Sequence, residues 1–220
     1  MKNSLICKIV TLAIAGGLLL SATSALAGSD AFNRPHLGPK WVPTSGSTLS
    51  ISHHELVGGT ASLGAFTGSS QDTAASAVMF LGGTDLEYGA VAVGNIAGGT
   101  NAFVKLQAQD GAGTFDHAAF YTGNNGSGTF FALSSPVPSP AIVDVFFCGT
   151  TATMRITSAA GVQTYTNNYG AKFGTGAGLG TFGSIGLDNY VGFASGCKDA
   201  RVHGIPASKM PRAKDLSLVK

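Results

Sequence analysis

Residues 120–131, Phe-Tyr-Thr-Gly-Asn-Asn-Gly-Ser-Gly-Thr-Phe-Phe, decide the fold class of this sequence. Asn124-Asn125-Gly126 joins two aromatic segments, and Asn and Gly are the residues that most readily adopt the positive φ angles of a tight β-hairpin turn. The stretch therefore predicts two antiparallel strands, near residues 117–122 and 129–132.

Alternation of apolar and polar residues continues on both sides of this hairpin. In residues 104–109, Val104, Leu106 and Ala108 alternate with polar side chains, as in a half-buried strand. Residues 141–148 are apolar on both faces except at Asp144, which predicts a strand inside a sandwich. Further strands are expected near residues 49–51, 55–57, 77–81, 88–93, 151–158, 162–169 and 185–193.

The segments between these strands contain Gly, Asn and Pro. Pro136, Pro138 and Pro140 predict an exposed, extended connection, and the glycines of residues 178–183 predict a tight turn. In residues 185–193 we expect Ile185, Leu187, Val191 and Phe193 on one face and Tyr190 on the other. Many short strands without amphipathic helices indicate an all-β sandwich or barrel.

The N-terminus predicts a cleavable signal peptide over residues 1–27. Lys2 and Lys8 precede an uncharged apolar run over residues 9–20, and Ala25-Leu26-Ala27 supplies the small residues of a cleavage site. The run is shorter than the roughly 20 residues that span a bilayer, and no comparable run follows. We therefore expect a secreted or periplasmic protein without a membrane span, beginning at Gly28.

Cleavage would leave 193 residues with eleven basic and eleven acidic side chains, which suits one domain. A neutral chain argues against a nucleic-acid partner, because such proteins present a basic face. Residues 198–220 hold six basic and two acidic side chains, and we interpret them as a basic C-terminal tail, with a solvated extension favoured over an interaction arm. Residues 28–197 then form the domain.

Two cysteines remain after cleavage, Cys148 and Cys197. In an oxidising compartment we expect this pair to form a disulfide. Two cysteines without nearby histidines would complete only half of a zinc site.

Two parts of the chain carry a family pattern. The first part consists of Asp30-Ala-Phe-Asn-Arg-Pro35, Leu37-Gly38, Trp41, Ser50-Ile51-Ser52 and Glu55-Leu56-Val57, and the second of Phe173-Gly-Thr-Gly-Ala-Gly-Leu-Gly-Thr-Phe-Gly183 with Leu187-Asp188-Asn189-Tyr190. They resemble the opening, and the glycine-rich turn and final strand, of concanavalin A-like lectin/glucanase (LamG-like) domains. The resemblance implies a jelly-roll sandwich of two curved antiparallel sheets over about residues 30–193. That family includes lectins, glycoside hydrolases, polysaccharide lyases and adhesion modules, so the fold does not choose among them.

The sequence holds few residues for glycosidic chemistry. Hydrolysis requires two carboxylates that flank the scissile bond, and the glucanases of that family carry Glu-x-Asp-x-x-Glu on one strand. Here Glu55 and Glu87 are far apart in sequence, although distant strands could still assemble a pair. A lyase requires a Tyr/His pair near a charge neutraliser, for which His117 and Tyr121 are candidates.

Asp110-Gly-Ala-Gly-Thr-Phe-Asp116 places two carboxylates around a glycine loop. Ca²⁺ prefers six to eight oxygen ligands, so a plain hairpin turn is favoured over a Ca²⁺ site. We expect no other metal and no cofactor. His53-His54 is interpreted as an exposed turn.

The predicted ligand-binding residues are Tyr121, Asn124 and Asn125. Amides can bind sugar hydroxyls and the tyrosine ring can stack on a sugar, although turn formation explains the amides without a ligand. We predict a secreted, non-catalytic carbohydrate-binding (lectin-like) module. The alternatives are a structural, adhesion or extracellular-matrix protein with a protein partner, and a polysaccharide-active hydrolase or lyase. The sequence leaves the ligand and the oligomeric state open.

Overall fold

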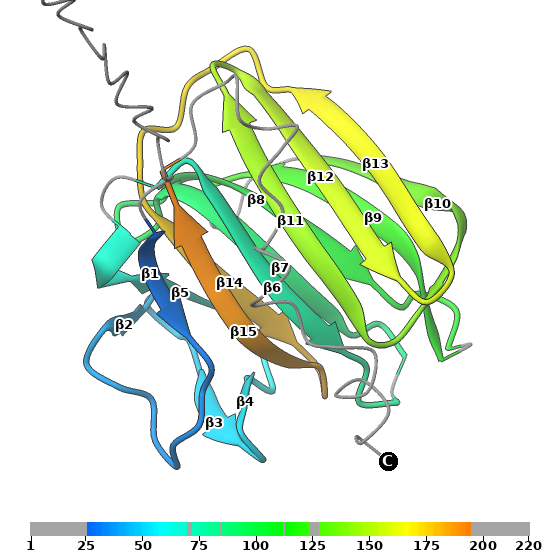
Figure 1. The fold of residues 1–220 in the computed structure, drawn as a ribbon, viewed down its shortest axis with the longest axis horizontal. Helices are drawn as coiled ribbons and strands as arrows, with labels where there is room; N and C mark the ends of the chain where they lie inside the picture. The colour runs from blue at the N-terminus through cyan, green and yellow to red at the C-terminus, as the bar shows by residue number, and fades with distance from the viewer. Residues whose placement is uncertain (1–25, 70–71, 84, 112, 124–127, 195–220) are drawn as a thin grey trace, which may run out of the picture.

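The computed structural model describes residues 26–194, except 70–71, 84, 112 and 124–127. Within these ranges the chain forms two packed antiparallel β-sheets, which confirms the predicted all-β sandwich (Figure 1). Asn124, Asn125, Cys197, the basic tail and most of the predicted signal peptide lie outside the described residues. No helix in the described ranges is long and apolar enough to span a membrane.

The eight-stranded sheet has the order β13-β12-β11-β6-β15-β4-β3, and β1 pairs with β15. It faces the viewer in Figure 1. Its strands are β1 (Leu26–Asp30), β3 (Ser50–Ser52), β4 (Glu55–Val57), β6 (Ala74–Phe80), β11 (Ala141–Cys148), β12 (Thr151–Ser158), β13 (Gly161–Asn168) and β15 (Gly186–Phe193).

The seven-stranded sheet lies behind it, in the order β10-β9-β8-β7-β14-β5-β2. A 3₁₀ turn, η1 (Thr67–Ser69), follows β5. The strands of this sheet are β2 (Trp41–Pro43), β5 (Ser62–Phe66), β7 (Tyr88–Asn95), β8 (Thr100–Gln107), β9 (Thr114–Thr122), β10 (Gly128–Pro138) and β14 (Ala177–Phe182).

The hydrophobic core fills the space between the two sheets. The alternation in residues 104–109 is confirmed, because Val104, Leu106 and Ala108 are buried whereas Lys105 is half-buried on the opposite face of β8. Met79 and Val143 enter the same core from the eight-stranded sheet. β7 and β8 therefore present one face to the core and the other to the outside of the sandwich.

The predicted single apolar face of residues 185–193 is wrong. The pairing of β15 with β6 shifts between Asp188 and Val191, and Asn189 has φ 51°. This irregularity is a β-bulge, whose extra residue reverses the alternation of side chains. Tyr190 therefore lies in the main core with Leu187, whereas Val191 packs in a separate cluster with Phe193.

The predicted proline-rich connection is also wrong in part. Pro136 and Pro138 belong to strand β10, and the pairing with β9 shifts between Ala132 and Val137. β10 is the edge strand of its sheet. An edge strand tolerates proline because its outer side has no partner strand, so the missing N–H of proline removes no hydrogen bond of the sheet.

Asp144 is a fully buried charged side chain in the middle of β11. Its carboxylate accepts hydrogen bonds from Ser76 Oγ at 2.6 Å and from Arg155 Nε and Nη2 at 2.9 and 2.6 Å. Burial of a carboxylate is tolerated when the charge is paired and hydrogen-bonded in this way. Asp144 therefore has a structural role in this fold.

Cys148 is half-buried at the end of β11. Because Cys197 lies outside the described residues, its pairing with Cys148 stays a prediction. We expect peptide mass mapping of exported protein under non-reducing conditions to find the two cysteines joined. Two freely alkylated thiols in that protein would contradict the prediction.

Candidate functional site

The outer face of the seven-stranded sheet carries a cluster of aromatic rings. Residues paired across neighbouring antiparallel strands point to the same side of a sheet, so the register defines this face. Ala90, Lys105, Ala119 and Phe130 form one row across β7 to β10. Neighbouring rows add Phe103 with Tyr121, and Tyr88 with Gln107, His117 and Phe182. We call Tyr88, Phe103, Lys105, Tyr121, Phe130 and Phe182 the aromatic face.

The rings of this face are arranged in stacked pairs. Phe103 and Tyr121 stack with centroids 5.3 Å apart and planes 13° from parallel, and Tyr88 stacks on Phe182 at 5.3 Å. Phe130 stacks on the His117 imidazole at 4.9 Å. Phe130 is 42 % exposed and the other rings of the face are half-buried. Stacking fixes the ring planes and leaves an apolar surface on the outside of the sheet.

Lys105 lies at the centre of the aromatic face. Its Nζ is 4.4 Å from the ring centroid of Tyr88, 5.1 Å from that of Tyr121 and 5.5 Å from that of Phe130. A cation over aromatic rings at these distances is attracted by their negative faces. Burial nevertheless lowers the pKa of Lys105, because the ammonium loses water contacts.

Small residues beside the rings leave room for a ligand. A pocket of about 300 Å³ is lined by Tyr88, Phe103, Ala90 and Gly180, together with polar residues that include Thr44. A Cβ on Gly180 would lie 2.8 Å from the Ser62 carbonyl oxygen, closer than neighbouring atoms allow. Glycine therefore keeps both the strand spacing and the floor of the pocket open.

This glycine-rich strand is what the sequence interpretation missed. Residues 178–183 were expected to form a tight turn, but residues 177–182 form β14, between β5 and β7. Glycine is depleted in strands, which hides such a segment. Leu179 and Thr181 alternate with glycines at the two-residue period of a strand, and this alternation could have indicated β14. Both side chains are fully buried, as expected for one face of a strand.

The structure places the predicted site residue Tyr121 on the aromatic face. The predicted hairpin is present, because β10 pairs with β9 and Gly128 lies opposite Tyr121. Asn124 and Asn125 belong to the connection between these strands, outside the described residues. The structure thus supplies the surroundings of Tyr121, while the roles of the two amides stay predictions.

The candidate lyase residues His117 and Tyr121 share the outer face of β9. Four residues of strand separate their Cα atoms by about 13 Å, which is far for an acid and a base that act on one bond. His117 Nδ1 lies 3.0 Å from Asp116 Oδ1. The arrangement therefore does not present His117 and Tyr121 as a close catalytic pair.

Asp116 is also one of the two aspartates considered for a Ca²⁺ site, where the sequence favours a plain hairpin turn. Burial alone would raise its pKa, but hydrogen bonds from the Gln109 and Asp110 backbone N–H groups and from His117 bring the pKa below its usual value. The side chain therefore closes its own loop, as the expected turn requires. The described residues contain no group of three or more His, Cys, Asp or Glu side chains arranged for a metal ion.

The two glutamates considered for hydrolysis lie in different places. Glu55 belongs to β4 of the eight-stranded sheet, whereas Glu87 is buried just before β7 and accepts a hydrogen bond from the Gly83 N–H. Asp188 of β15 lies near Glu55. Burial and the nearby Asp188 charge raise the pKa of Glu55, and burial raises the pKa of Asp188 to about 6.

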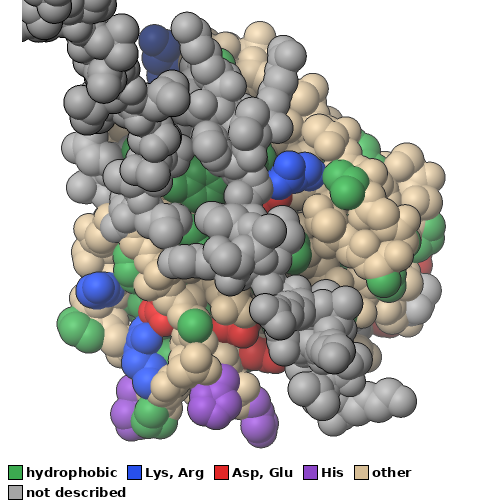
Figure 2. Space-filling view, in the orientation of Figure 1, with side chains coloured by type: hydrophobic (Ala, Val, Ile, Leu, Met, Phe, Trp, Pro, Cys, Tyr) green, Lys and Arg blue, Asp and Glu red, His purple; other side chains and the backbone are tan. Residues whose placement is uncertain are grey.

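Glu55 and Asp188 belong to the eight-stranded sheet, whereas the aromatic face is the outer face of the other sheet. Figure 2 shows acidic side chains beside histidines at the end of the molecule where β3 and β4 lie. The histidines of the β3–β4 turn, His53 and His54, are exposed and have φ 51° and 67°, which confirms the expected turn. The charge of His53 opposes the increase in the pKa of Glu55, and that of His54 opposes the increase in the pKa of Asp188, but burial outweighs both.

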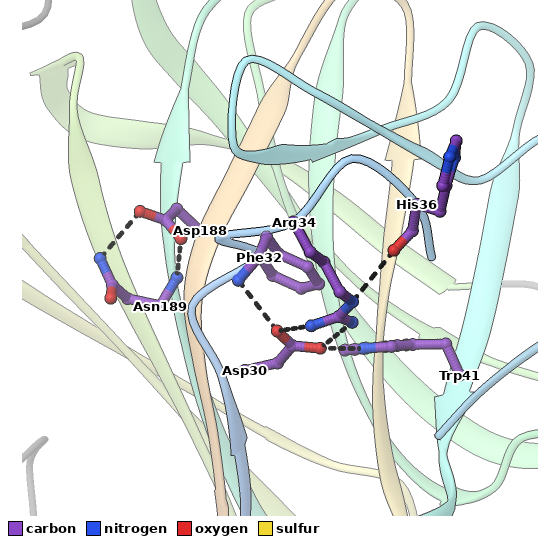
Figure 3. A network of polar contacts seen from close by, with 7 residues as sticks. All are labelled: Asp30, Phe32, Arg34, His36, Trp41, Asp188 and Asn189. Carbon is purple, nitrogen blue, oxygen red and sulfur yellow. Dashed lines mark hydrogen bonds and ion pairs between the residues drawn. The ribbon is translucent and has the colours of Figure 1, made fainter. Parts of the chain in front are cut away.

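Four of the residues that carry the N-terminal part of the family resemblance form one polar cluster: Asp30, Phe32, Arg34 and Trp41 (Figure 3). The Asp30 carboxylate accepts hydrogen bonds from the Phe32 N–H at 2.9 Å, from Trp41 Nε1 at 2.7 Å and from Arg34 Nη1 and Nη2 at 2.7 and 2.5 Å. Burial raises the pKa of Asp30, but these hydrogen bonds outweigh it and lower the pKa below its usual value. The cluster fixes the chain between β1 and β2.

Comparisons with known proteins find similar solved structures. No protein-family model matches the chain, and no curated protein matches it. Lectin II from Ulex europaeus superposes on 78 % of this chain and 99 % of its own, with a TM-score of 0.50 and 13 % identity. A GlcNAcα1-4Gal-releasing endo-β-galactosidase from Clostridium perfringens matches 78 % of this chain and 63 % of its own, with a TM-score of 0.53 and 12 % identity.

The catalytic domain of an endo-1,3-β-glucanase (laminarinase) from Thermotoga petrophila matches 77 % of this chain and 97 % of its own, with a TM-score of 0.50 and 11 % identity. A lectin and two glycosidases thus share one architecture with this chain. The two packed antiparallel sheets, the core between them and these superpositions all indicate the same fold. The chain has the jelly-roll sandwich fold of the concanavalin A-like lectins and glucanases.

Proposed function

We propose that this chain is a secreted, non-catalytic carbohydrate-binding protein and that the aromatic face is its binding site. The observation that carries the proposal is the group of stacked rings on the outer face of the seven-stranded sheet, beside a pocket of about 300 Å³. Sugar rings carry apolar C–H faces that stack on aromatic side chains, and their hydroxyls bind polar groups at the rim. Thr44 and Ser45 supply such groups at this pocket.

The proposal of a non-catalytic site rests on the residue types at the centre of this face. The outward positions of β7, β8 and β14 carry Ala, Gly, aromatic, amide and lysine side chains and no Asp or Glu, within the described residues. Hydrolysis with retention or inversion requires a carboxylate pair at the bond. A ligand held over Phe103 and Tyr88 would meet rings and small residues instead.

Removing one stacked pair should remove most of the binding. We expect Phe103→Ala combined with Tyr121→Ala to weaken binding of a polysaccharide recognised by the wild type by about 30-fold or more, because truncated aromatic anchors cost about 2 kcal/mol or more. Isothermal titration with the ligand found on a glycan array measures the loss.

The matched control is Val162→Ala, an apolar side chain that is 62 % exposed on β13 of the other sheet. This variant should bind like the wild type. Equal affinity of the double variant and the control, with melting temperatures near that of the wild type, would place the site elsewhere. A wild-type protein that binds no glycan but captures a defined protein would favour the adhesion alternative.

The hydrolase alternative has one specific observation in its favour. Glu55 and Asp188 are neighbouring carboxyl groups whose pKa values are both raised, and raised pKa values are typical of general acids. A reducing-end assay on mixed polysaccharides tests this alternative. Turnover by the wild type that disappears in Asp188→Asn and persists in Asp110→Asn would establish an enzyme.

A further inference from the structure

The aromatic face holds a positive charge that no described residue neutralises. The ion pairs found among the described residues include Arg34 with Asp30 and Arg155 with Asp144, and none is found for Lys105. Burial is the cause of its lowered pKa, without an opposing contribution from a nearby carboxylate. Lys105 therefore keeps a charged group at a half-buried position without a counterion.

The surroundings of Lys105 make this position unusual for a merely structural lysine. Its Nζ lies within 5.5 Å of three ring centroids, over a row whose neighbours, Ala90 and Ala119, are small. The rings attract the cation weakly and at the same time exclude water from it. A solvated lysine would instead extend away from the sheet and keep its full hydration.

We propose that the ligand of the aromatic face is an acidic saccharide whose carboxylate or sulfate group binds to the Lys105 ammonium. This inference rests on the proposed function and adds the chemical class of the ligand. The stacked rings Phe103–Tyr121 and Tyr88–Phe182 would hold the sugar faces on either side of the charge. An anion placed there restores the interactions that the ammonium loses on burial, and it does so in a site where charge attraction is stronger than in water.

The residues around Lys105 do not oppose an anion. Across the strands its row contains Ala90, Ala119 and Phe130, and the diagonal neighbours are Tyr88 and Tyr121. The carboxylate of Asp116, at the far end of β9, is already engaged by His117 and two backbone N–H groups. The potential at the centre of the face is therefore set by the lysine.

The test compares polymers that differ only in charge. Polygalacturonate and its fully methyl-esterified form carry the same sugar backbone with and without carboxylates, and dextran sulfate and dextran make the same comparison for sulfate. We expect the wild-type chain to bind at least one acidic polymer about 10-fold or more tightly than its neutral counterpart at 0.15 M salt. The pair that shows the preference identifies carboxylate or sulfate as the recognised group.

Variants of the lysine assign that preference to this site. Lys105→Gln keeps the length of the side chain and removes the charge, so its affinity for the acidic polymer should fall to that for the neutral one. Lys105→Arg keeps the charge and should retain the preference. The control Lys172→Gln removes an exposed lysine from the loop between β13 and β14 and should bind like the wild type. This control also tests whether an exposed lysine elsewhere on the chain contributes to binding through unselective attraction of polyanions.

The outcomes separate the two proposals. A preference for acidic polymers that survives in Lys105→Gln, with normal melting behaviour, overturns the role of Lys105. Equal binding of charged and neutral polymers that is lost in Phe103→Ala with Tyr121→Ala overturns the acidic ligand and leaves the carbohydrate-binding function in place. Absence of binding to every polymer in the wild type overturns both.

Discussion

Replacing Asp30 by alanine should lower the free energy of unfolding by about 4 kcal/mol. The substitution leaves the Trp41 indole N–H and the Phe32 backbone N–H without their acceptor, and both residues are buried. Each unsatisfied buried donor costs about 1–3 kcal/mol. Arg34 adds less, because its side chain is 35 % exposed and can be solvated. Urea denaturation monitored by fluorescence of Trp41 measures the change.

Two further variants show that the effect comes from the acceptor. Asp30→Asn keeps one carbonyl oxygen and should cost about half as much, since one of the two buried donors can still be satisfied. Asp110→Ala removes an exposed aspartate and should leave the unfolding midpoint almost unchanged. A loss below about 1 kcal/mol for Asp30→Ala would show that water replaces the carboxylate and that the cluster in Figure 3 is not a determinant of stability.

The second large effect is a loss of stability with rising pH. Asp72 is fully buried, neither of its carboxylate oxygens has a hydrogen-bond partner among the described residues, and burial raises its pKa from 3.8 to about 7. The folded state therefore holds the Asp72 proton more tightly than the unfolded state does. Its contribution to stability is fully present below about pH 4 and is lost as the pH rises to about 7.

At about 1.4 kcal/mol for each unit of pKa shift, this loss amounts to as much as about 4 kcal/mol. Asp72→Asn removes the titrating group and should flatten the dependence of the unfolding free energy on pH between about 4 and 7. Glu55 and Asp188 also have raised pKa values and act in the same direction. The difference between wild type and Asp72→Asn isolates the contribution of Asp72, and parallel curves for the two proteins would contradict it.

These two aspartates illustrate how differently one residue type behaves in one fold. Asp30 is buried with four hydrogen bonds and a cation, and its pKa falls. Asp72 is buried beside Gly192, where a Cβ on that glycine would collide with the Asp72 carboxylate, and the pKa of Asp72 rises. Burial raises the pKa at both positions, so the hydrogen-bond partners decide the direction.

The sequence by itself determined the fold class and most of the strands. Alternation in residues 104–109 and the Asn-Gly turn between 117–122 and 129–132 depend only on neighbours along the chain, and β8, β9 and β10 form as these patterns indicate. The same holds for the buried strand around Asp144. Local patterns succeed here because the two-residue period of a strand is imposed by its backbone geometry.

The tertiary structure decided the features that involve several strands at once. The reversal of faces at Asn189 depends on pairing with β6, the glycine-rich β14 is a strand only because β5 and β7 flank it, and Pro136 is tolerated because β10 is an edge. The aromatic face has the same origin. Tyr88, Phe103 and Tyr121 lie on three different strands. The register between these strands stacks Phe103 on Tyr121. The same register places Lys105 Nζ over the rings of Tyr88 and Tyr121. Sequence spacing gives the side of a strand on which a residue lies, whereas its neighbours on that side are set by long-range pairing.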